Sequence, residues 1–158
     1  MNETANMPLM AERLESLKAG IIGGFSVGLA FLITSLVNTL VVARYFPTLA
    51  SLQSEINGRW WLSGGIAAFS GLLFGVTYRY IIRTDENPQL KSGGVMAFGL
   101  VRGLTQIDSA QTILPGLVLA GESVLWFAMG AIALDTTIQI GWVKPFKLTQ
   151  GSDEPSKN

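Results

Sequence analysis

Three long stretches with almost no charged side chains constrain this sequence more than any other feature. Ala19 to Ala43 has 25 residues and no charge, and Trp60 to Tyr78 has 19 residues and no charge. Ile113 to Leu134 has 22 residues, with Glu122 as its only charge. A helix of about 20 apolar residues crosses the roughly 30 Å hydrocarbon core of a bilayer, because each residue adds about 1.5 Å. Each stretch therefore predicts a transmembrane helix.

A further segment, third in chain order, is less apolar. From Ser92 to Ile107 its only charged residue is Arg102, and continuation to Gln111 makes it long enough to cross. The alternative is a re-entrant hairpin over residues 92–107. A full crossing predicts an all-α integral membrane protein, a four-helix bundle in one transmembrane domain at 19–142. Its predicted spans are 19–43, 60–82, 91–111 and 113–134.

The composition excludes several classes of function. Charged residues make up 14% of the chain and apolar residues 49%, whereas a soluble domain carries about 25% charge. The net charge is zero, so no nucleic-acid surface is expected. The chain has no His and no Cys, and it contains neither a phosphate loop nor a dinucleotide fingerprint. We therefore expect a non-enzymatic protein with no catalytic residue, no cofactor and no metal site.

Polar segments flank the predicted transmembrane domain. Residues 1–18 contain a predicted short amphipathic helix, since Leu9, Leu14 and Leu17 recur at helical spacing after Pro8. This helix either lies on the membrane surface, docks on a partner or simply leads into the first span. Residues 143–158 are predicted to form a polar, disordered tail.

Lysine and arginine are distributed unevenly between the two faces that four crossings create. The loops away from the termini carry only Arg44 and Arg59. The face with both termini carries Arg13, Lys18, Arg79, Arg83, Lys91, Lys144, Lys147 and Lys157. Because cytoplasmic loops are enriched in these residues, both termini are predicted to be cytoplasmic, or stromal in an organelle.

Six glycines form pairs that are spaced by one helical turn. The pairs are Gly24 and Gly28, Gly71 and Gly75, and Gly99 and Gly103. Small residues at this spacing let two helix backbones approach closely within a membrane. Two uses are open, namely packing inside the bundle and a surface for partner helices or a second copy.

Arg102 and Glu122 are predicted to lie near the middle of the membrane on consecutive antiparallel spans. Arg102 is roughly 16 Å deep when counted from Lys91, and Glu122 is roughly 20 Å deep when counted from Asp135. A lone charge at this depth costs at least about 2.5 kcal/mol, so the two side chains are expected to pair. The pair is interpreted either as a structural clamp or as the centre of a proton, ion or ligand site.

Polarity continues beyond Arg102 along the same predicted helix. Gln106 and Ser109 share a face with Arg102, and Asn38 of the first span lies near the same side. These residues predict a wet interior stripe if the helix continues, and a simple loop if it ends early.

The run Leu17-Lys-Ala-Gly-Ile-Ile-Gly-Gly-Phe-Ser-Val-Gly28, behind its amphipathic lead, resembles small multi-spanning membrane proteins of cyanobacteria and plastids, many of them uncharacterised. The resemblance covers residues 1–40 and carries no site residues across. It implies a photosynthetic setting, in a thylakoid or plasma membrane, and a role in assembling or supporting a larger complex.

These observations lead to three functional hypotheses. The first is an assembly factor or accessory subunit that packs against partner helices, or a second copy, in the lipid bilayer. The alternative is a small transporter or a proton or ion pathway built around Arg102 and Glu122. The third is pigment or quinone binding, since a glutamate paired with an arginine can ligate a chlorophyll magnesium.

Overall fold

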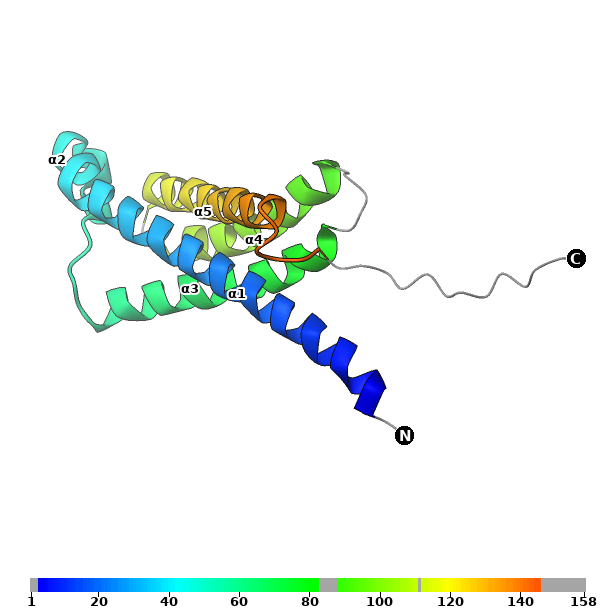
Figure 1. Ribbon diagram of the computed structural model, residues 1–158. Helices are drawn as coiled ribbons and strands as arrows, with labels where there is room; N and C mark the ends of the chain where they lie inside the picture. The colour runs from blue at the N-terminus through cyan, green and yellow to red at the C-terminus, as the bar shows by residue number, and fades with distance from the viewer. Residues whose placement is uncertain (1–2, 83–87, 111, 146–158) are drawn as a thin grey trace, which may run out of the picture.

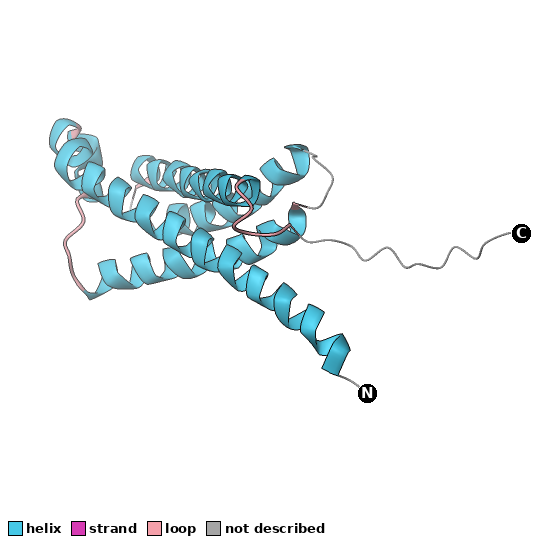
Figure 2. Ribbon diagram, in the orientation of Figure 1, coloured by secondary structure: helices cyan, strands magenta, loops and turns pink. Residues whose placement is uncertain are grey.

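The computed structural model describes residues 3–82, 88–110 and 112–145. Regular structure in these ranges is entirely helical, which confirms the all-α class (Figure 2). The elements are α1 (Glu3–Val37), the π-helical turn η1 (Asn38–Val42), α2 (Ala43–Tyr45), the 3₁₀ turn η2 (Pro47–Leu52), α3 (Gly58–Ile81), α4 (Pro88–Ser109) and α5 (Ile113–Gln139). Figure 1 shows α1 crossing α3 at an angle, with α4 and α5 lying side by side.

The first helix is longer than predicted and has no boundary at residue 18. The stretch Leu9–Tyr45 is one continuous helix of 37 residues. No Gly or Pro occurs between Pro8 and Gly20, and most residues there are good helix formers, so nothing interrupts the helix. We expected a separate amphipathic helix within residues 1–18. The structure shows instead that the described part of this segment forms the first turns of a single long helix.

Three helices are long and apolar enough to cross a membrane: Leu9–Tyr45, Gly58–Ile81 and Ile113–Gln139. A membrane location is plausible on this ground. The helix α4 is not among the three, because it carries Lys91, Arg102 and Asp108. It is nevertheless unbroken through residues 92–107, where the alternative was a re-entrant hairpin. Most of the predicted polar tail at 143–158 lies outside the described residues.

The helices α1 and α3 pack through glycines on both partners. A Cβ atom added to Gly71 would lie 2.6 Å from the carbonyl oxygen of Gly23, and one added to Gly24 would lie 3.0 Å from that of Ala68. Gly75 packs directly on the backbone of Ala19. These approaches leave no room for larger side chains, as expected where helices associate by close backbone packing.

The helices α4 and α5 pack in the same way. A Cβ atom on Gly99 would lie 2.8 Å from the Cα atom of Val124, and one on Gly103 would lie 3.1 Å from that of Ala120. Five of the six predicted packing glycines thus lie in close contacts within the chain. The exception is Gly28, whose added Cβ atom would meet only the side chain of Ala68, at 3.6 Å.

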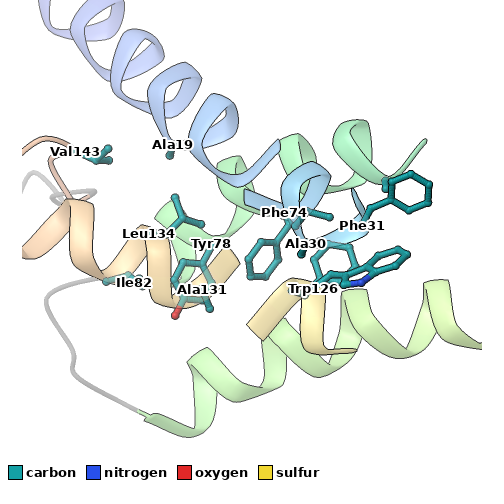
Figure 3. Packing of buried hydrophobic residues seen from close by; sticks show 13 residues of the cluster. Ala19, Ala30, Phe31, Phe74, Tyr78, Ile82, Trp126, Ala131, Leu134 and Val143 are labelled. Carbon is teal, nitrogen blue, oxygen red and sulfur yellow. The ribbon is translucent and has the colours of Figure 1, made fainter. Parts of the chain in front are cut away.

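An aromatic layer forms the centre of the bundle where α3, α4 and α5 meet. The ring of Phe74 lies 5.2 Å from that of Phe127 and 5.4 Å from that of Phe98, centroid to centroid. Figure 3 shows Phe31 and Trp126 together at one end of the buried cluster, with Leu134 and Val143 toward the other. This layer lies between the end of the bundle that holds Arg79 and Lys144 and the end that holds the 46–57 segment.

The segment after α5 turns back onto α1 at one end of the bundle. Gly141, with a φ of 79°, ends α5 in the left-handed conformation that glycine adopts most easily. The chain then turns back, so that the amide of Lys144 donates to the carboxylate of Glu15 on α1 at 2.9 Å.

Arg79, near the end of α3, ties these segments together. Its side chain is 1% exposed and forms an ion pair with Glu12 of α1. It also donates to the hydroxyl of Ser16 at 2.7 Å and to the carbonyl oxygen of Lys144 at 2.9 Å. The sequence analysis placed Arg79 only as a charge at a helix end and missed this network.

Candidate functional site: a polar cavity ending at Glu122

A polar cavity of about 360 Å³ lies at the end of the bundle opposite the described chain ends. Exposed residues of segment 51–59 form its rim, and side chains from α1, η1, α3, α4 and α5 form its walls. Gln106 and Asn38 are among the lining residues, so part of the predicted interior stripe faces this cavity. The cavity is therefore open toward the face that carries the 46–57 segment.

Glu122 of α5 and Asn38 of η1 face one another in the wall of the cavity. The amide nitrogen Nδ2 of Asn38, a residue only 4% exposed, donates to Oε1 of Glu122 at 2.8 Å. The other carboxylate oxygen, Oε2, has no hydrogen-bond donor within the described ranges. Asn38 begins the π-helical turn, and single π turns within helices frequently occur at functional sites.

Three aromatic rings form one wall of the cavity. The ring of Phe31 lies 5.5 Å from that of Trp60 and 5.6 Å from that of Trp126. Hydroxyl groups of α1 hold both indoles in place, since Trp60 Nε1 donates to Ser35 at 2.8 Å and Trp126 Nε1 donates to Thr34 at 3.0 Å. Because both indole donors are used, the wall presents ring surface to the cavity.

The structure does not bring Arg102 and Glu122 together. Neither residue belongs to an ion pair among residues 3–82, 88–110 and 112–145. The guanidinium of Arg102 instead lies over the ring of Trp126, 5.1 Å from its centroid, and reaches the carbonyl oxygen of Ser63 at 3.5 Å. The interpretation of the two charges as a clamp or as a joint site is corrected accordingly.

The physical reason is the rotation of α5. This helix meets α4 through Ala120 and Val124, which contact the glycines of α4. Glu122 is two residues from each, roughly 200° around a helix of 3.6 residues per turn. Its side chain therefore points away from α4 and toward Asn38.

Arg102 also lines a second hollow, an apolar groove of about 480 Å³ between α3 and α4. The groove is lined largely by apolar side chains, and Ile66, Leu73 and Val101 are exposed along it. The Nε atom of Arg102 is buried and has no hydrogen-bond partner in the described part of the chain. An arginine without an acidic partner thus lies in the wall of an otherwise apolar surface groove.

The sequence analysis placed Asn38 beside a predicted interior stripe but did not connect it with Glu122, and it missed the aromatic wall. A tryptophan near the start of a span, such as Trp60, is typical of a membrane interface. Its position in the sequence therefore gave no reason to expect that it lines a cavity. The available signal was Asn38, the one amide side chain within the stretch 19–43. No cluster of three His, Cys, Asp or Glu side chains that could hold a metal ion occurs in the described ranges.

Comparison with protein-family models, with curated proteins and with solved structures finds no match for this chain. Its function is therefore inferred from the cavity, the groove and the surfaces of its helices.

Proposed function

We propose that this chain is a non-enzymatic multi-pass membrane protein that packs against partner helices of a larger membrane complex, as an assembly factor or accessory subunit. It crosses the membrane four times, with both termini on the cytoplasmic or stromal face of a plasma or thylakoid membrane. The observation that carries this proposal is the guanidinium of Arg102 in the groove between α3 and α4, which has no acidic partner and an unbonded Nε atom in the described residues.

The outer surfaces of the long helices favour a membrane setting but do not by themselves indicate a partner. Large apolar side chains such as Phe25, Leu62, Val101 and Leu125 are exposed on α1, α3, α4 and α5. Lipid chains solvate such surfaces as well as a protein partner does. The argument for a partner therefore depends on the polar group among them.

A positive charge in the middle of a span needs compensation. Placing an arginine at the centre of a transmembrane helix costs about 2.5–3.5 kcal/mol on insertion scales. The ring of Trp126 and the distant carbonyl oxygen of Ser63 offset part of this cost, but they leave Nε without an acceptor. A partner helix with a carboxylate, seated in the groove, would supply charge-assisted hydrogen bonds to the guanidinium.

Native gel electrophoresis of membranes from the source organism, solubilised in mild detergent, tests this proposal. The wild-type chain should migrate with a large complex, and Arg102→Gln should shift it to a small species. Arg44→Gln is the matched control, because Arg44 lies exposed on α2 and lines no groove. A wild-type chain that migrates as a discrete small oligomer, or an Arg102→Gln variant that stays in the complex, would count against the proposal.

A second candidate function is a small transporter or a proton or ion pathway, and the cavity that ends at Glu122 favours it. In this structure the pathway would depend on Glu122 without Arg102. The layer of Phe74, Phe98 and Phe127 closes the bundle beyond the cavity, so transport would require these rings to separate. Proton flux into liposomes that is lost in Glu122→Gln would support this candidate, and flux equal to that of empty liposomes would not.

A further inference from the structure

We propose that the cavity ending at Glu122 binds a small organic cation, a protonated or quaternary amine, which enters from the face that carries the 46–57 segment. This inference deepens the second candidate function by naming the ligand class of the same site. It is independent of helix docking, because the docking groove lies between α3 and α4, on the other side of Trp126.

The inner end of the cavity lacks a positive charge. Asn38 donates to one oxygen of Glu122, which orients the carboxylate, and no cation of the described chain lies within ion-pair distance of the other oxygen. Arg102 is the nearest candidate by sequence analysis, but Trp126 holds it in the neighbouring groove. A cationic ligand would supply the missing counter-charge at Oε2.

The aromatic wall selects an organic cation over a hydrated metal ion. Phe31, Trp60 and Trp126 line the cavity with ring surface, and their indole donors are already bonded to α1. Aromatic rings attract ammonium groups through their negative faces, and cages of such rings recognise quaternary ammonium ligands. The guanidinium of Arg102 over one face of Trp126 shows that this ring already accommodates a cation.

The rim and the size of the cavity are consistent with a small ligand. Glu55 and Arg59 at the rim carry opposite charges, so together they favour neither cations nor anions. A preference for cations over anions therefore depends on Glu122. The volume of about 360 Å³ lies at the lower end of the roughly 300–1,000 Å³ range of small-molecule pockets.

Choline and its uncharged carbon analogue 3,3-dimethyl-1-butanol are matched probes, because they share a shape and differ in charge. Each is titrated into the full chain in lipid nanodiscs while tryptophan fluorescence is followed, with empty nanodiscs as the background. Two of the four tryptophans line the cavity, so occupancy should change the signal. We expect a saturable response to choline and binding of the alcohol that is weaker by at least about tenfold.

Three variants locate the site. Glu122→Gln should weaken choline binding by at least about tenfold, whereas Glu122→Asp, which keeps the charge, should retain the preference for choline over the alcohol. Asp108→Asn removes an exposed carboxylate of α4 that does not line the cavity, and it should leave the affinity within about twofold. Equal binding of choline and the alcohol by the wild-type chain, or unchanged binding in Glu122→Gln, would overturn the inference. Glu122-dependent proton flux without choline binding would also overturn it, while leaving the pathway candidate in place.

Discussion

Arg79 and Arg102 are both arginines on helices of one bundle, yet their surroundings differ. Arg79 is 1% exposed and bonds to Glu12 and Ser16 of α1 and to the backbone of Lys144, so it joins α3 to two other parts of the chain. Arg102 has an aromatic ring and one distant carbonyl oxygen, with no acidic partner. The first arginine joins three segments of the fold, whereas the Nε atom of the second has no hydrogen-bond partner in the described residues.

Replacement of Arg79 by Gln should therefore destabilise the protein strongly. Breaking a fully buried ion pair costs about 3–5 kcal/mol, and the cost here should be smaller, about 2–3 kcal/mol, because the Glu12 side chain is 41% exposed. Thermal unfolding in lipid nanodiscs measures the change. Arg13→Gln is the control, since Arg13 is exposed and makes no ion pair in the described ranges. Equal melting temperatures of the two variants would show that the Arg79 network contributes little.

The sequence could predict how deep a residue lies but not which way it points. Counting along the spans placed Arg102 and Glu122 at similar depths, which follows from helix length alone. Whether they meet depends on the rotation of each helix, and that rotation is set by the contacts of Gly99 with Val124 and of Gly103 with Ala120. The cavity could not be predicted for the same reason, since it requires Asn38 and Glu122 to face one another across two helices that are distant in sequence.

At the level of elements, the sequence predicts most helices well because length and hydropathy dominate. The prediction of 60–82 corresponds to Gly58–Ile81, and that of 91–111 corresponds to Pro88–Ser109. The span predicted at 113–134 starts at the observed residue and continues to Gln139. The continuity of the first helix and its π turn were not predicted, since local propensity does not distinguish a lead-in helix from the span it joins.

Two glycines of α3 allow a matched test of helix packing. A Cβ atom on Gly71 would lie 2.6 Å from both the Gly23 carbonyl oxygen and the Val27 Cβ atom, whereas one on Gly65 would meet nothing within 4 Å. Gly71→Ala should destabilise the bundle by about 1–3 kcal/mol through overpacking. Gly65→Ala should stabilise it by about 0.5–1 kcal/mol, because alanine loses less backbone entropy in a helix. Melting of both variants in the same mild detergent measures the difference, and shifts of the same sign would contradict this account of the α1–α3 interface.

At the level of the whole molecule, the fourth crossing depends on how α4 lies against α5. The two helices are in contact along their length, from the Lys91–Asp135 ion pair at 3.2 Å to the approach of Gly116 to Ile107. If α5 crosses the membrane as proposed, a helix that runs beside it for its whole length would lie in the same layer. Arg102 lowers the hydropathy of α4, and its guanidinium lies against Trp126 of α5 and Ser63 of α3, contacts that would reduce the cost of placing α4 in a membrane.

The four-crossing arrangement predicts on which side of the membrane each end of α4 lies. The chain has no cysteine, so single cysteines at Ser92, Ser109 and Gln53, all exposed, can be labelled with a membrane-impermeant thiol reagent. The 22 residues of α4 reach about 33 Å, enough to place its two ends on opposite sides, with Ser92 and Ser109 about 26 Å apart near the two surfaces. Ser109→Cys should label from the same side as Gln53→Cys, and Ser92→Cys from the cytoplasmic side, because Lys and Arg are concentrated on the face of the termini.

Labelling of Ser92→Cys and Ser109→Cys from one side would limit the chain to three crossings and would place the end of α5 on the face opposite the start of α1. The ion pair between Arg79 and Glu12 and the bond from Lys144 to Glu15 would then have to break, since they join those ends in the structure.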